Sequence, residues 1–323
     1  MSLAQLEEQL LTKFRRSLKK AIDQSDGVQW ADVDDRIVQK LMLRAIRHFD
    51  LDHHVTIQWF KDGDVLTELD SLDSEVILTN AGVDEGPIPS EGEIVSYYTS
   101  GIQEWDLEDV INTDDRGEWL MQYYESTDMR FEEIYLIEME IHLYLKRCRK
   151  ACLDEVSEDL FEGDITEPLA CAANELKREL VRYPLFRNVP PYVTEFERIA
   201  IDILSQIQDN VEETEKEYSY YIDVFSQLNK FFYNSVWEII ANRIGFYTAE
   251  GPSEEVVRAY RKGTLLVAHE TFISEFDKLK DVCNQQEISI SAETGRLPEL
   301  DPEEDQIESL LDWEESDRQE LEV

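Results

Sequence analysis

The side chains best suited to bind a metal ion are three cysteines and a histidine. Cys148 and Cys152 are spaced to share one face of a helix, with His142 before them and Cys171 further along the chain. Thiolates and imidazoles are the usual ligands of tetrahedral zinc. The spacing matches none of the common zinc patterns, and free cysteines are among the most frequently buried residues. We therefore interpret the cysteines as core residues and expect neither a metal ion nor a cofactor.

A second ionisable group, Asp50, Asp52, His53 and His54, follows an expected helix. Carboxylates and imidazoles can bind a divalent cation or transfer protons. Two adjacent histidines point in different directions, however, and histidine also favours helix C-termini. We interpret this group as a helix end and a turn.

Enzyme motifs are missing from the chain. It has no phosphate-binding loop, dinucleotide-binding glycine motif, H-E-x-x-H pair or G-x-S-x-G turn. The dipeptide His269-Glu270 begins the zinc-peptidase pattern but lacks its second histidine. We expect a non-enzymatic protein, and an enzyme or metal-binding protein with an unrecognised site stays an alternative.

The net charge is strongly negative and unevenly distributed. The chain carries 72 acidic against 31 basic side chains, a formal charge of -41. Residues 55–128 carry 19 acidic and 2 basic side chains, and residues 285–323 carry 14 and 2, whereas residues 1–54 are balanced at 9 and 9. Such a field repels nucleic acid and anionic membranes and attracts basic proteins. We expect a basic protein surface or a nucleic-acid-binding protein as the partner, with no direct contact to nucleic acid or membrane.

The acidity has three explanations: a saline habitat, a basic partner or imitation of a polyanion. Extreme halophiles usually reduce cysteine and large apolar residues, but this chain keeps 4 Cys, 13 Phe, 14 Tyr and 6 Trp. We favour a partner over the habitat. The acidic runs 104–118 and 208–217 are the candidates for a DNA-mimicking surface, although a charge run is usually a solvated face.

A basic face is expected on the first helix, opposite its leucine stripe. Its core is Lys13, Arg16 and Lys20, with Arg15 and Lys19 beside them. Contact with nucleic acid or an anionic lipid is one interpretation. The simpler interpretation, which we favour, is a solvated face paired with acidic parts of the same molecule.

The acidic tail contains an apolar edge formed by Ile307, Leu310, Leu311 and Trp313. A tryptophan in a largely disordered acidic segment contributes little to folding. Acidic segments with short amphipathic anchors commonly dock into a groove with a basic rim. These four residues are the predicted partner-binding anchor.

The elements predict an α+β protein that is predominantly helical. Residues 1–54 form a helical pair, 55–116 an acidic β-rich module, 117–284 a helical domain and 285–323 a disordered acidic tail. Strand candidates are Val55–Phe60, Val65–Leu69, Val76–Leu78 and Ile94–Tyr98, with a turn at Asp62-Gly63.

Three segments of the sequence can be interpreted in more than one way. Residues 137–146 fit a strand or a helix, and the capping residues favour a helix. The polar stretch 208–217 most simply separates two helices. Residues 253–282 are expected to form one helix in which Gly263 could introduce a bend.

The leading prediction is a cytoplasmic, non-enzymatic adaptor or regulator that binds a basic partner through its acidic surfaces and tail anchor. The first 16 residues have no apolar core of the signal-peptide type, and no run approaches a membrane span. The alternative is a DNA mimic that inhibits a nucleic-acid-binding protein.

Overall fold

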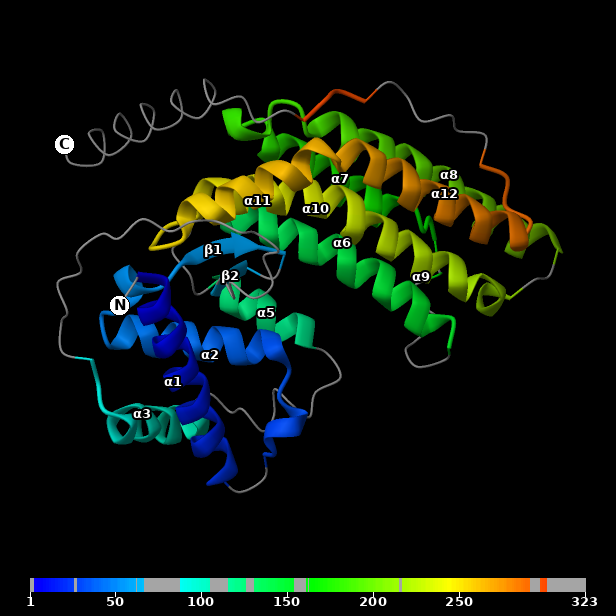
Figure 1. The fold of residues 1–323 in the computed structure, drawn as a ribbon. Coiled ribbons are helices and arrows are strands. Elements are labelled where there is room, and N and C mark those ends of the chain that lie inside the picture. Colours follow the sequence, from blue (N-terminus) through cyan, green and yellow to red (C-terminus); the bar gives the residue numbers. More distant parts are fainter. Residues whose placement is uncertain are drawn as a thin grey trace, which may run out of the picture. The chain divides into compact units, whose positions relative to one another are not determined.

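The computed structural model describes residues 3–25, 28–61, 63–66, 88–104, 116–125, 131–153, 161, 163–214, 217–290 and 297–300. Within these ranges the chain is predominantly helical and contains one antiparallel pair of strands, which confirms the predicted fold class (Figure 1). The chain divides into two compact units. Unit 1 combines residues 1–123 with 244–261, and unit 2 combines 124–243 with 262–323. This division differs from the consecutive segments expected from the sequence, because unit 1 takes in residues 244–261.

Unit 1 begins with two amphipathic helices, α1 (Leu3–Asp23) and α2 (Asp35–His48). The described positions of the apolar stripe expected on α1 are all buried: Leu6, Leu10, Phe14, Leu18 and Ile22. The carboxylate of Asp34 accepts a hydrogen bond from the Arg36 backbone N–H at 2.8 Å and so caps α2. The helical pair predicted from the leucine periodicity is confirmed.

A short hairpin follows, with strands β1 (Ile57–Phe60) and β2 (Gly63–Leu66) paired antiparallel. Ile57 lies opposite Leu66 and Phe60 opposite Gly63. Gly63 has a φ of 85°, a conformation that glycine adopts without steric cost. The turn predicted at Asp62-Gly63 is therefore confirmed at Gly63, the residue of the pair that the structure describes. The strand candidate Val76–Leu78 lies outside the described residues.

The strand predicted at Ile94–Tyr98 is wrong, because these residues belong to helix α3 (Glu91–Glu104). The hydroxyl of Ser90 accepts a hydrogen bond from the Glu93 N–H, and the Glu93 carboxylate accepts from the Ser90 N–H at 2.7 Å. This reciprocal capping box starts a helix. Ser90 and Glu93 carried that signal in the sequence, and the short apolar run after them obscured it.

Residues 244–261 complete unit 1 from the far part of the chain. Ile57 and Glu250 exchange two backbone hydrogen bonds of 3.0 Å, so an isolated bridge covers the free edge of β1. Next to it Gly251 has a φ of 112°, and a Cβ there would lie 2.3 Å from the Val55 carbonyl oxygen. The close approach of the two backbones therefore requires glycine.

Unit 2 is built from helices, and α5, α10 and α11 contain residues of both units. The helices are α5 Arg116–Glu125, α6 Glu132–Ala151, α7 Glu167–Leu180, α8 Pro190–Thr214, α9 Ile222–Phe231, a π-helix Phe232–Val236, α10 Trp237–Thr248, α11 Glu254–Leu266 and α12 Ala268–Gln285. Short 3-10 turns cover Trp30–Asp32 and Asp52–His54 in unit 1, and Pro184–Phe186 and Tyr218–Tyr221 in unit 2.

Two of the open helical assignments are confirmed. Residues 137–146 lie within α6, whose first turn is acidic and whose last turn is basic, as the capping argument required. The polar stretch 208–217 does separate two helices, since α8 ends at Thr214 and α9 begins at Ile222. In unit 2, α6 packs on α7 and α9, and α9 packs on α12.

The prediction of one helix over 253–282 with a bend at Gly263 is wrong. The chain forms α11 and α12, and they are separated at Val267, where φ is -101° and ψ is 2°. Gly263 lies inside α11, and a Cβ at this position would meet nothing within 4 Å. A glycine weakens a helix without ending it, so Gly263 is not the break.

The chain after α12 is packed where the structure describes it. Ile288, Ile290 and Leu300 are buried. The Gln206 side chain donates to the Ser289 carbonyl at 3.0 Å and accepts from the Ser289 N–H at 3.1 Å. The Tyr192 hydroxyl donates to the Pro298 carbonyl at 2.8 Å. A tail beginning at 285 therefore starts too early, and the rest of the predicted tail, 301–323, lies outside the described residues.

Candidate functional site

A buried carboxylate in unit 1 connects three distant parts of the chain. Glu7 on α1 accepts hydrogen bonds from the Thr56 N–H and, at 3.0 Å, from the Ser253 hydroxyl. The Ser253 N–H donates to the Thr56 hydroxyl at 2.8 Å. Burial raises the pKa of Glu7, and the hydrogen bonds from Thr56 and Ser253 oppose that rise. All three side chains are buried, so the group fixes the start of α11 to α1 and β1.

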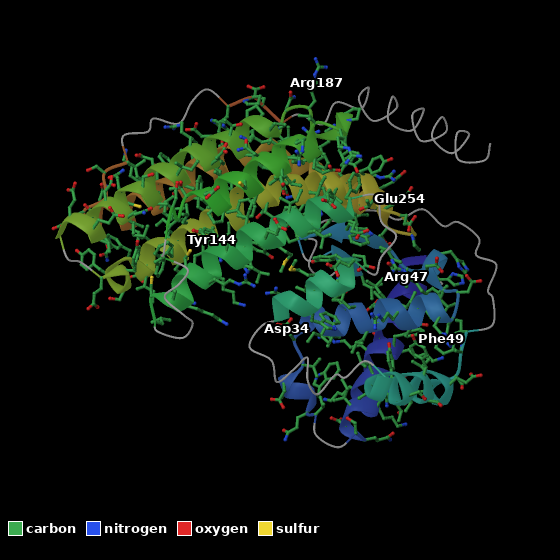
Figure 2. All side chains as sticks on the ribbon, turned by 180° about the vertical axis from the view of Figure 1, so that it is seen from behind. Asp34, Arg47, Phe49, Tyr144, Arg187 and Glu254 are labelled. Carbon is green, nitrogen blue, oxygen red and sulfur yellow. The ribbon has the colours of Figure 1, made fainter. Side chains whose placement is uncertain are left out.

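A buried ion pair holds β2 on α2. The Lys40 ammonium lies 3.0 Å from Asp64 Oδ1, and these side chains are 1% and 0% exposed. Arg47 places Nη1 2.8 Å from the other Asp64 oxygen, and its own side chain is 43% exposed. Figure 2 marks Arg47 and Phe49 at the end of α2. The triad neutralises a carboxylate that would otherwise be buried at high cost.

A third buried group uses Arg261 of α11. Its Nε donates to Gln58 Oε1 at 2.9 Å, and its guanidinium carbon lies 3.5 Å from the centre of the Phe60 ring. These three polar groups were not predicted. Glu7 and Lys40 lie on inward-facing positions of their helices, which was the available signal, but their partners come from 24 to 246 residues away. Apart from the half-exposed Arg47, the polar side chains of these groups are buried, so the groups stabilise unit 1 and form no open ligand site.

The histidine group ends α2, as the sequence predicts. Asp50 has a φ of 56°, its N–H bonds the Arg47 carbonyl, and the Leu51 N–H bonds the Ile46 carbonyl. This pattern is a Schellman helix end. The rings of His53 and His54 are 3.9 Å apart. His54 is buried, and burial followed by the charge of His53 lowers its pKa.

Cys148 on α6 and Cys152 directly after it pack in the core of unit 2, whereas Cys171 on α7 is exposed, so the interpretation as core residues is wrong for Cys171. Burial raises the pKa of the Cys148 and Cys152 thiols to about 12. Within the described ranges, no group of three or more His, Cys, Asp or Glu side chains is placed to hold a metal ion.

Exposed carboxylates gather where α8 ends in unit 2. The acidic end is defined here as Asp164, Asp209, Glu212, Glu213 and Glu217, which are all exposed. Gln208 joins its two sides, because its side-chain amide donates to the Gly163 carbonyl at 3.0 Å and to Glu212 at 3.2 Å. This contact brings the loop of Asp164 to the last turn of α8. The described carboxylates of the acidic run 208–217 are thus exposed, whereas most of the run 104–118 lies outside the described residues.

The acidic end contradicts a rule of helix stability. Glu212 and Glu213 occupy the negative end of the α8 dipole, and the last turn of α8 has no basic residue. Each misplaced carboxylate costs about 0.3–1 kcal/mol. Aromatic rings lie beside them: Tyr218 stacks on Phe161 at 3.8 Å, and Tyr220 is 41% exposed. Burial, with a smaller effect of Glu212, raises the pKa of Tyr218. Charge kept at such a cost, beside an exposed ring, is typical of a binding surface.

Comparison with known proteins assigns the chain to a family. The model of a domain of unknown function (DUF8098) matches it over residues 1–87 and 73–314. The chain belongs to the DUF8098 family. No curated protein and no solved structure matches it.

The DUF8098 match covers most of the described residues of both units and continues to residue 314. It therefore includes the acidic end and the tail anchor Ile307, Leu310, Leu311 and Trp313. The anchor itself lies outside the described residues. Among the described helices, none is both long and apolar enough to span a membrane.

The basic face of this DUF8098 chain is largely paired within unit 1. Lys13 donates to the Pro89 carbonyl, and Lys20 lies 3.3 Å from Glu91 of α3. Arg15 lies 3.1 Å from Asp35 of α2. These contacts agree with the interpretation of a face paired inside the molecule. Arg16 is exposed and differs from them, as described below.

Proposed function

We propose that the protein is a non-enzymatic adaptor or regulator that binds a basic surface of another protein. The acidic end of unit 2 carries this proposal, because it combines exposed carboxylates, two of them at the negative end of the α8 dipole, with an exposed aromatic ring. In binding interfaces, charges of this kind steer the encounter and aromatic rings supply the buried contact. The tail anchor is the proposed second contact, and its position inside the family match supports it.

The mechanism is electrostatic steering followed by burial of apolar side chains. Carboxylates on one surface raise the rate of encounter with a cationic partner, and added salt screens that effect. Tyr220 and the anchor residues Leu310, Leu311 and Trp313 would then lose contact with water and hold the complex. The two stages predict different responses to mutation, because lost charge slows association whereas lost apolar contact speeds dissociation.

The test begins with the full chain as bait in its native source at low and high salt. A protein retained at low salt and released at high salt is then purified and titrated with the bait. We expect Asp209→Asn, Glu212→Gln and Glu213→Gln together to weaken binding about tenfold at low salt, with a smaller effect at high salt. Trp313→Ala or removal of 301–323 is expected to speed dissociation.

The control removes equal charge elsewhere on unit 2. Glu270, Asp277 and Asp281 are exposed carboxylates of α12, and their amide variants change the net charge by the same amount. An equal loss of binding in the control would show that net charge causes the effect, and would reject the acidic end as the binding surface. Displacement of the partner by duplex DNA, with no effect of the tail variants, would instead identify a DNA mimic.

A further inference from the structure

One open surface depression of unit 1 is lined by three cations, two carboxylates and an amide. Arg16, Lys19, Lys20 and Asp23 of α1, Gln24 directly after it and Glu91 of α3 border a volume of about 360 Å³. This volume is that of a small-molecule site rather than a protein interface. The cavity stands out in a chain whose acidic side chains outnumber the basic ones by more than two to one.

Two of the five α1 cations differ from the other three in their contacts. As described above, Lys13, Arg15 and Lys20 bind groups of α2, α3 or the turn before α3. In the part of unit 1 that the structure describes, Arg16 and Lys19 form neither an ion pair nor a hydrogen bond, and both are exposed. Three cations therefore attach α1 to its neighbours, and two remain for a ligand at the cavity.

The start of α3 does not provide this site. The Ser90 and Glu93 backbone N–H groups are already bound in the capping box. The Glu93 carboxylate also places negative charge there, and hydrogen bonds from Ser90 lower its pKa, so that it is ionised at neutral pH. An anion in the cavity would therefore bind to the side chains of α1.

We propose that this cavity binds a small phosphate monoester with hydroxyl groups, such as a sugar or inositol phosphate. A guanidinium binds two phosphate oxygens at once, and an ammonium binds them as a point charge, which are the roles of Arg16 and Lys19. Asp23, Gln24 and Glu91 accept hydrogen bonds from the hydroxyls of the ligand. The two carboxylates disfavour an extended polyanion, which would bring further negative charge against them.

The site is independent of the proposed protein partner, which binds unit 2 and the tail. At physiological salt, charges separated by more than about 8 Å are largely screened. The strongly negative net charge therefore weakens binding of an anion at this cavity without preventing it. We expect a dissociation constant in the range of about 0.1 to 10 mM, set by a few exposed charge-assisted bonds.

The test titrates the full chain with glucose 6-phosphate at constant ionic strength, using calorimetry and the phosphorus NMR signal. Inorganic phosphate and glucose are the comparison ligands. We expect saturable binding at one site, weaker binding of phosphate and none of glucose. Arg16→Gln with Lys19→Gln is expected to weaken binding at least about tenfold. Both side chains are exposed, so the thermal melting of the variant should match that of the parent chain.

The matched control is Arg178→Gln with Lys230→Gln, which removes two exposed cations from unit 2. We expect this variant to bind within about twofold of the parent, because neither side chain lines the cavity. Vesicles with phosphoinositide headgroups test the lipid source of the same chemistry, and binding to vesicles without binding of glucose 6-phosphate would overturn the proposal of a small soluble ligand. Titrations that do not saturate, or equal losses in both variants, would overturn the proposal.

Discussion

Lys40 and Asp64 form an ion pair that is almost completely removed from water. Two charges in this position lose hydration, and their mutual attraction repays the loss only when the geometry is good. Arg47 adds a second cation at 2.8 Å. The pair is therefore stable as a unit, and each member depends on the other.

Lys40→Met is expected to destabilise unit 1 by about 3–5 kcal/mol, because Asp64 then stays buried with only a half-exposed partner. Urea unfolding, read by amide hydrogen exchange in α2, measures the change. Lys40→Met with Asp64→Leu removes both charges and should recover part of the loss. If the double variant is as unstable as the sum of the two single variants, the ion pair is not the cause.

His54 predicts a pH dependence of unit 1. Its lowered pKa means that the folded chain resists a proton which the unfolded chain accepts near pH 6.5. The free energy of unfolding should therefore fall as the pH drops below that value and level off below the folded pKa. Glu7 acts in the opposite direction, since its raised pKa makes the folded chain accept a proton more readily.

The comparison of His54→Gln with the parent chain cancels the effect of Glu7. We expect the parent to lose more stability than the variant between pH about 7.5 and about 5. Urea unfolding at several pH values gives both curves. His269→Gln, at an exposed position of α12, is the control and should follow the parent. Parallel curves for His54→Gln and the parent would reject the assignment.

At the scale of elements, residues 248–253 show how a distant segment completes unit 1. The bridge at Glu250 covers β1, the hydroxyl of Thr248 accepts from the Trp59 N–H at 2.8 Å, and Ser253 bonds Glu7 at 3.0 Å. Gly251 lies between these contacts, where two backbones meet. The segment is therefore part of the sheet layer, although about 190 residues separate it from β1 in the sequence.

Substitution of Gly251 and of Gly263 by alanine should change stability in opposite directions. Gly251→Ala is expected to destabilise unit 1 by several kcal/mol, roughly the cost of a steric clash together with a strained φ. Gly263→Ala should stabilise α11 by about 0.5–1 kcal/mol, since its Cβ would meet no neighbour. Thermal melting of the two variants provides the comparison. A mild effect at Gly251 would show that the two backbones can separate.

The sequence predicted elements that are determined by residues close together in the chain. The stripe from Leu6 to Ile22 defined α1, and the dipole-matched ends of α6 outweighed its strand-like alternation. The strand expected at Ile94–Tyr98 failed because four apolar and aromatic residues weighed more than the capping box before them. The bridge at Glu250 and the partners of Glu7 and Lys40 depend on tertiary contacts, for which one sequence gives no pairing. The basic face was predicted as a set, but its division into paired and unpaired cations required the neighbouring helices.

At the scale of the whole molecule, charge and packing are separated along the chain. The described residues after α12 bury Ile288, Ile290 and Leu300, whereas the sequence from 301 onwards contains the tail anchor and most of the acidic residues of the last segment. A deletion that begins at 298 would remove Leu300 and the carbonyl that binds Tyr192. Such a variant would confuse folding with partner binding, so the tail should be removed after Leu300.

Two truncations test this division. A chain that ends at Gln285 should lose several kcal/mol in unit 2, since burial of each Ile or Leu side chain contributes about 1.5–3 kcal/mol. It also leaves Gln206 and Tyr192 without their backbone partners. A chain that ends at Leu300 keeps these contacts and should melt close to the full chain. Thermal melting together with hydrogen exchange in α8 distinguishes the two results. Equal destabilisation by both truncations would mean that residues 301–323 also stabilise unit 2, and the anchor would then have a role in folding as well as in binding.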